Sequence, residues 1–198
     1  KFLANTAGGD ISLNNGTGGT AWRSVSVGAN NAVLDIIGGG TLTVGGVVGN
    51  ANTDGDNPLT IGSATSNGKI VFSGTNTWNG DLKLAGATLS VSQDVNLSSV
   101  NNWIDFTGNA TLQTTGTFTN TRVVNIRSGA TGTFAPDAGT TLTISGYGIR
   151  GAGDLVISGP GTVELNATNV YSVNNYTGKT TIQSGTLKLG AGASIASS

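Results

Sequence analysis

The chain contains an internal repeat in which one segment recurs 98 positions later, and this repeat restricts the folds available to it. Each copy places an asparagine, an aromatic residue and a glycine at alternate positions, and short strand-like patterns follow. The matched residues are Asn76 and Asn174, Trp78 and Tyr176, Gly80 and Gly178, Thr88 and Thr186, and Leu89 and Leu187. A repeated unit of this kind indicates stacked coils, because each unit buries its apolar face against the next. We interpret these ten residues as structural positions.

Triplets whose first and third residues are apolar occur along most of the chain, as expected for strands with one buried face. The apolar pairs are Leu42/Val44, Leu59/Ile61, Ile70/Phe72, Leu82/Leu84, Leu89/Val91, Ile104/Phe106, Val124/Ile126, Leu142/Ile144, Leu155/Ile157, Val163/Leu165 and Leu187/Leu189. Glycine often precedes a triplet, where it allows a sharp bend. The spacing predicts eight or nine coils with loops at Asn50–Pro58, Gln93–Asn102 and Ala167–Val173.

The composition supports an all-β protein with a buried core. Hydrophobic residues make up 36% of the chain and charged residues only 10%, which disfavours disorder. Glycine, threonine, serine, asparagine and β-branched residues dominate, and they disfavour helix. A short helix is conceivable only within residues 91–104, with Leu97, Val100 and Ile104 on one face, and a loop or ragged strand is favoured there.

Charge and residue content exclude several classes of function. The net charge is -1 and the basic residues are scattered, so we expect no nucleic-acid partner. The chain has no cysteine, which removes disulfides and thiolate metal sites. It has no apolar run long enough to span a bilayer, and we expect no membrane insertion of this segment.

The chain also lacks histidine, which removes Ser-His-Asp catalysis, and we predict that it is not an enzyme and needs no cofactor. Asp154 and Glu164, with Arg150, are the carboxylate candidates, expected about one rung apart. One adjacent pair among ten acidic residues is expected by chance, so a catalytic role is disfavoured. Residues 54–57 resemble a calcium loop but lack its later glutamate, which favours an ordinary exposed turn.

Six aromatic residues are large enough to stack on a sugar ring if exposed. They are Trp22, Trp78, Trp103, Tyr147, Tyr171 and Tyr176. Trp78 and Tyr176 hold equivalent repeat positions, so we predict that both pack at a coil corner. Trp22 and Trp103 are less constrained, and we single them out as candidates for contact with a ligand.

Three motifs in the second repeat copy carry a family resemblance. They are Gly-Thr-Val-Glu-Leu from Gly161, Asn-Tyr-Thr-Gly-Lys-Thr-Thr-Ile from Asn175, and Gly-Thr-Leu-Lys-Leu-Gly from Gly185. This sequence resembles the autotransporter-associated β-strand repeat, strongly over Gly161–Gly190 and more weakly over Lys69–Val91. The resemblance implies a right-handed parallel β-helix that is exported and either displayed on a bacterial cell surface or released. It implies no shared catalytic residues.

We therefore predict one β-solenoid over residues 1–198, which is a fragment or a repeating subunit of a larger surface assembly. Its expected role is structural, as a surface stalk, an adhesin segment or a fibre subunit. Residues 1–15 and 191–198 contain no obvious cap, so copies could stack end to end. The expected partners are other copies or host and surface glycans. The alternative is a carbohydrate-binding or carbohydrate-degrading β-helix protein.

Overall fold

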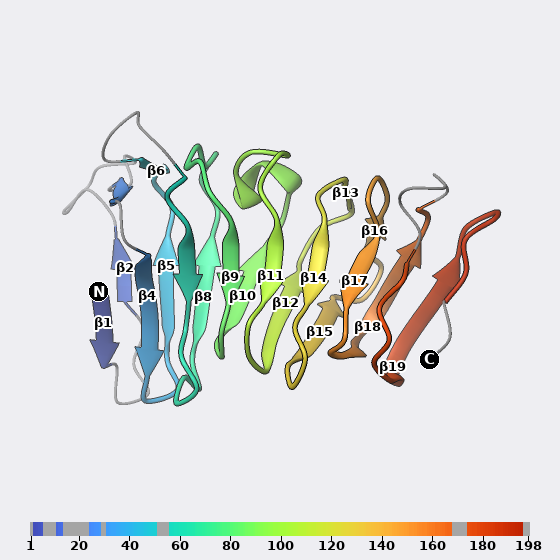
Figure 1. Cartoon of the computed structure of the whole chain (residues 1–198). Helices are drawn as coiled ribbons and strands as arrows, with labels where there is room; N and C mark the ends of the chain where they lie inside the picture. Colours follow the sequence, from blue (N-terminus) through green and yellow to red (C-terminus); the bar gives the residue numbers. More distant parts are fainter. Residues whose placement is uncertain are drawn as a thin grey trace.

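The computed structural model describes residues 2–5, 11–13, 24–28, 31–50, 56–167 and 174–195, and over these residues the chain is a parallel β-solenoid. The strands stack along one axis, from β1 at one end to β19 at the other (Figure 1). Every strand pair is parallel, and within the described residues the single helical element is a 3₁₀ turn, η1 (Asp94–Leu97). The all-β solenoid prediction is confirmed.

Each coil has three sides. The first side is the seven-stranded sheet β1 (Phe2–Asn5), β4 (Ala32–Ile37), β7 (Leu59–Ile61), β9 (Leu82–Leu84), β11 (Ile104–Phe106), β14 (Val124–Ile126) and β17 (Ile149–Gly151). The second side contains β2 (Ile11–Leu13), β5 (Thr41–Val44), β8 (Lys69–Phe72), β10 (Thr88–Val91), β12 (Ala110–Thr114), β15 (Thr131–Pro136) and the first halves of β18 (Asp154–Leu165) and β19 (Thr180–Leu189). The third side contains β3 (Val25–Val27), β6 (Val48–Asn50), η1, β13 (Phe118–Asn120), β16 (Thr141–Ile144) and the second halves of β18 and β19.

The sheets give about seven turns, and β19 adds one more rung to the second and third sides. The predicted eight or nine coils is therefore slightly too many. Loops between strands make the coils unequal in length. The number of coils therefore cannot be obtained accurately from an average spacing.

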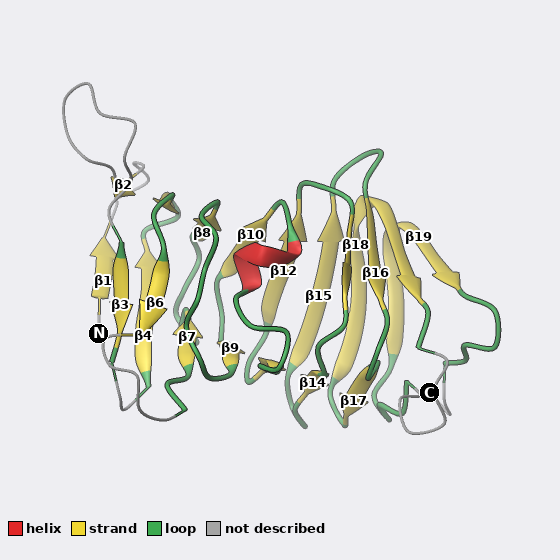
Figure 2. Cartoon of the chain, turned by 90° about the horizontal axis from the view of Figure 1, so that it is seen from above, coloured by secondary structure: helices red, strands yellow, loops and turns green. Residues whose placement is uncertain are grey.

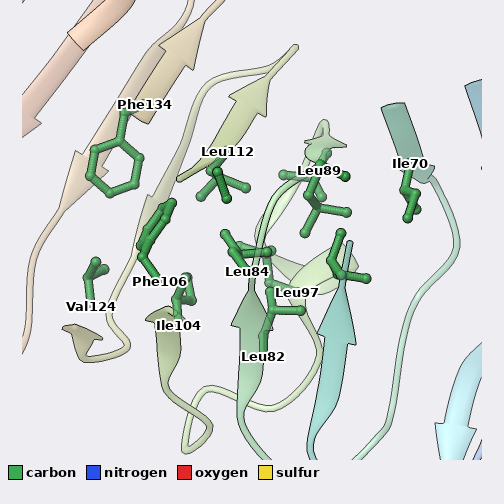
Figure 3. Close-up of a cluster of buried hydrophobic side chains, with 14 of the residues drawn as sticks. Ile70, Leu82, Leu84, Leu89, Leu97, Ile104, Phe106, Leu112, Val124 and Phe134 are labelled. Atoms are coloured by element: carbon green, nitrogen blue, oxygen red, sulfur yellow. The ribbon is translucent and has the colours of Figure 1, made fainter. Parts of the chain in front are cut away.

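The core is built from columns of apolar side chains that stack from coil to coil. Leu82, Ile104 and Val124 are paired rung on rung along the first side, and each is at most 1% exposed. Ile70, Leu89 and Leu112 form a facing column on the second side (Figure 3). Burying one such side chain contributes about 1.5–3 kcal/mol, so the solenoid is stabilised along its length by nearest-neighbour contacts.

Ten of the eleven predicted triplets are strands with both apolar residues buried. The exception is Leu187/Leu189 in β19, where Leu187 is partly buried and Leu189 is 44% exposed. These two side chains are partly exposed because β19 is the last strand of its sheet in the structure and is covered on one side only, by β18.

The two sequence repeats lie on different sides of the coil. Leu89 stacks on Ile70 and Leu112 in the second side, whereas Leu187 pairs with Val163 in the third side. The residue that continues the Leu89 column is Ile182, through Phe134 and Ile157. The second copy is therefore displaced by one side of the three-sided coil, and the expected common position of Leu89 and Leu187 is wrong.

The predicted loop at Gln93–Asn102 is present and contains η1, which lies at the upper edge of the stacked strands in Figure 1 and in front of them in Figure 2. Leu97 is buried but Val100 is 54% exposed, so these residues do not share a helix face. Residues 51–55 and 168–173 of the other two predicted loops lie outside the described residues. Over the part of the chain that the structure describes, no helix has the length and apolar character needed to cross a membrane.

Candidate functional site

The repeat asparagines are hydrogen-bonded bridges between three successive coils. The side-chain oxygen of Asn76 accepts from the Val48 amide at 2.8 Å, and its nitrogen donates to the Asn96 carbonyl at 2.7 Å. Asn174 does the same with the Ile149 amide at 3.0 Å and the Ser194 carbonyl at 3.3 Å. In both copies the second partner is 20 residues ahead in the sequence. The chemistry of the corner is thus kept although the side of the coil changes.

The repeat aromatics fill the corner beside each asparagine. Trp78 and Tyr176 are both fully buried, which agrees with the predicted packing role. The Trp78 indole nitrogen donates to the Gly80 carbonyl at 3.0 Å, and the Tyr176 hydroxyl bonds the Thr180 hydroxyl at 2.6 Å. Burial raises the pKa of Tyr176, and the bond to Thr180 partly opposes this.

Glycine is required after each aromatic residue because the preceding coil lies against it. A β-carbon on Gly80 would lie 2.4 Å from the backbone of Asn57, and Gly80 has a φ of +135°. A β-carbon on Gly178 would lie 2.0 Å from the Gly153 carbonyl oxygen. The corner therefore needs all three residues in both copies. The asparagine bridges the coils, the aromatic residue fills the corner, and the glycine allows the close backbone contact.

Removing the buried asparagine bridge should destabilise the coil. Asn76→Ala leaves the Val48 amide and the Asn96 carbonyl without this partner, and we expect a loss of about 1–3 kcal/mol of unfolding free energy. The exposed Asn79→Ala is the matched control, with an expected change within about 0.5 kcal/mol. Urea unfolding of the two variants measures the difference, and equal stabilities would contradict the bridging role.

Of the two aromatic ligand candidates, Trp103 lies at a surface hollow. Trp103 is 42% exposed and follows the buried Asn102, whose side chain bonds Gly80 and Trp78. Its own amide donates to the Asp81 carboxylate at 2.9 Å. The hollow encloses about 240 Å³ and is lined by Val100, Asn101, Trp103, Val123, Tyr147 and Arg150. Trp22 and Tyr171 lie outside the described residues.

The residues of the hollow come from three successive coils. The Val123 carbonyl accepts from Ile104 at 2.9 Å, and the Gly148 carbonyl accepts from Val124 at 3.1 Å. Trp103, Val123 and the Tyr147–Gly148 turn are therefore neighbours at one corner. Tyr147 is 53% exposed and lies between Gly146 and Gly148, which have φ of +66° and +69°. The Gly-Tyr-Gly sequence is the signal that could have located Tyr147, because the two glycines allow the tight turn that exposes the tyrosine.

A buried arginine holds the loop that forms another wall of the hollow. Arg122 is 1% exposed, pairs with Asp94, and donates to the Ser98 carbonyl at 2.6 Å and the Ser99 carbonyl at 3.0 Å. Val100 and Asn101 follow these two serines directly. The wall is consequently fixed before any ligand binds.

The carboxylate candidates do not form a common site. Asp154 and Glu164 are in the same strand, β18, on different sides of one coil, so the expected spacing of one rung is wrong. Asp154 accepts from the Lys179 amide at 2.8 Å, and Glu164 pairs with Lys188 at 3.0 Å. Arg150 is on the first side, in β17. The strand is longer than the triplet pattern indicated, because it continues through the corner between Ile157 and Val163.

The possible calcium turn is only partly described, since Asp54 and Gly55 fall outside the described residues. Among the residues that are described, no group of three or more potential acidic ligands is close enough to hold a metal ion.

Comparison with known proteins gives one curated relative. The adhesin BmaC autotransporter of Brucella suis biovar 1 (strain 1330) is 37% identical over 128 residues, which is 65% of this chain. The chain is passenger-like in sequence and in fold. The aligned region spans 4% of the length of that relative. No family model matches the passenger-like chain, and no solved structure matches it.

The relative is named as an adhesin, and the part of this chain that the structure describes is an extended solenoid. The resemblance to an autotransporter passenger that the sequence indicated is confirmed.

Proposed function

We propose that this segment is a surface-displayed stalk whose solenoid carries ligand-binding surfaces away from the cell. The observation that supports this most strongly is the uninterrupted core. Each coil packs its apolar column on the next from Leu42 through Ile70, Leu89, Leu112 and Phe134 to Ile157, all at most 1% exposed. A solenoid of this kind adds length coil by coil with only nearest-neighbour contacts. The similarity to an adhesin supports the extracellular or cell-surface location.

We further propose that the β19 end pairs with another solenoid coil, as in a fibre. Ile182 is 54% exposed and Leu189 is 44% exposed, although both continue columns that are buried in the preceding coil. An edge strand with apolar side chains adds another strand readily. All described strand pairs are parallel, so a further coil would add to β19 in the direction of the coils before it.

Sedimentation velocity of the purified chain tests this end-to-end pairing. We expect oligomers that grow with concentration in the parent chain and monomers in Ile182→Lys/Leu189→Lys, because charge at the edge prevents strand addition. Val95→Lys is the control, since Val95 is 45% exposed in η1, away from β19. A parent chain that stays monomeric at all concentrations would contradict the proposed pairing at β19. The proposal of a surface stalk does not depend on that pairing.

A further inference from the structure

We propose that the hollow between Trp103 and Tyr147 binds a saccharide ring that carries an acidic group. This site goes beyond the structural role and does not depend on pairing at the β19 end. It combines two exposed aromatic side chains, an amide and a guanidinium around one cavity of about 240 Å³.

The two aromatics are placed to enclose one ring. Trp103 and the Tyr147–Gly148 turn are two coils apart, with Val123 in the coil between them. Neighbouring strands are about 4.8 Å apart, so the aromatic positions are separated by about 10 Å along the solenoid. Carbon atoms in contact are about 3.5–4.0 Å apart, which leaves space for one ring layer between the two aromatic groups. Val123 is 6% exposed and is short enough to leave the hollow open.

The polar groups of the hollow determine the kind of ring. Asn101 offers an amide, Tyr147 a hydroxyl and Arg150 a guanidinium, while the apolar surface comes from Trp103, Val100 and Val123. Of the described residues that line the hollow, Arg150 is the only charged one. A guanidinium has five N–H donors, so it can bind a carboxylate in addition to its contacts within the protein. A sugar offers apolar C–H faces to the aromatics and oxygens to the donors, and a carboxylate complements the guanidinium. An apolar peptide side chain would leave these polar groups unused.

The hollow is held open by groups beneath it. Arg122 fixes the Ser98 and Ser99 carbonyls, and Asn102 is bonded to Trp78 and Gly80, so both ends of the Val100–Asn101 wall are anchored. On the opposite side, a β-carbon on Gly146 would lie 2.4 Å from the Thr121 carbonyl, which shows how closely the Tyr147 turn packs. Little ordering is needed on binding, and a preformed site of this kind gains affinity from that.

A glycan array followed by calorimetry tests the site on the purified 198-residue chain. The array contains uronate-bearing and other acidic oligosaccharides together with the same oligosaccharides after their carboxyl groups have been reduced to alcohols. We expect binding to acidic saccharides and at least tenfold weaker binding to their reduced counterparts. Trp103→Ala and Tyr147→Ala should each weaken the affinity about tenfold or more, and Arg150→Gln should abolish the preference for the acidic form.

Thermal unfolding of each variant separates lost binding from lost structure, because Trp103 and Tyr147 are exposed and their removal should leave the melting temperature nearly unchanged. Val95→Ala, outside the hollow, should bind as the parent does. The proposal is wrong if no acidic saccharide binds, if reduced saccharides bind equally well, or if Trp103→Ala binds unchanged. Trp103-dependent capture of a deglycosylated protein, with no saccharide bound, would mean that a peptide occupies the hollow and would also overturn it. Since binding is measured on the isolated chain, it is independent of assembly.

Discussion

Leu89→Asp is expected to destabilise the solenoid far more than Leu187→Asp. Leu89 is fully buried between Ile70 and Leu112, so the substitution removes a core side chain and buries a carboxylate. We expect a loss of more than about 4 kcal/mol, enough to unfold neighbouring coils. Leu187 is only partly buried in β19, where water reaches the new carboxylate, and we expect a loss of about 1 kcal/mol.

Urea unfolding compares the two variants, and amide hydrogen exchange shows which coils open. Exchange is the more informative measurement, because a solenoid can lose some coils while others remain folded. Leu89→Asp should raise exchange from β8 to β12, whereas Leu187→Asp should affect only β18 and β19. Equal destabilisation by both substitutions would indicate that the two leucines occupy equivalent buried positions after all.

The strands and corners could be predicted because they depend on local chemistry. Alternation of apolar residues in triplets such as Leu82-Lys83-Leu84 places one face in the core wherever the coil begins. The asparagine, aromatic and glycine of each repeat also act locally, because Asn76 and Asn174 bond the coils before and after them whichever side they occupy. Sequence similarity between the copies was therefore enough to identify the asparagine, aromatic and glycine of each corner, whereas the matched Leu89 and Leu187 lie on different sides of the coil.

The side of the coil could not be predicted, because it depends on the sum of all intervening loop lengths. The register pairs Leu42 with Ile70, 28 residues later, but pairs Ile70 with Leu89 after only 19. With coils this unequal, a repeat distance in sequence does not give a whole number of turns. The same limitation hid the hollow, since Trp103, Val123 and Tyr147 come together only when three coils are in the correct register. Trp103 was singled out for its residue type, and its neighbours were not.

Replacing the buried Arg122 by alanine is expected to lower the unfolding free energy substantially. Nothing near Arg122 in the sequence distinguishes it from the eight other basic residues, yet its side chain is 1% exposed. Arg122→Ala would leave the Asp94 carboxylate and the Ser98 carbonyl without this donor, and it would leave the Ser99 carbonyl with the Asn102 amide alone. Breaking a fully buried ion pair by removing one partner costs about 3–5 kcal/mol. Because the Asp94 carboxylate is 27% exposed, we expect a loss at the lower end of this range, about 3 kcal/mol. Lys188→Ala is the control, because Lys188 is 60% exposed and its pair with Glu164 contributes at most about 1 kcal/mol.

The same substitution distinguishes support of the loop from a general loss of stability. Because Arg122 anchors residues 98–99, Arg122→Ala should expose the Gln93–Asn102 loop to limited proteolysis before the rest of the chain is cut. It should also weaken saccharide binding at the hollow, although Arg122 does not line it, since Val100 and Asn101 would lose their fixed position. Lys188→Ala should change neither property. An Arg122→Ala chain whose loop resists protease and whose melting temperature is unchanged would show that the backbone turns hold the loop without the arginine.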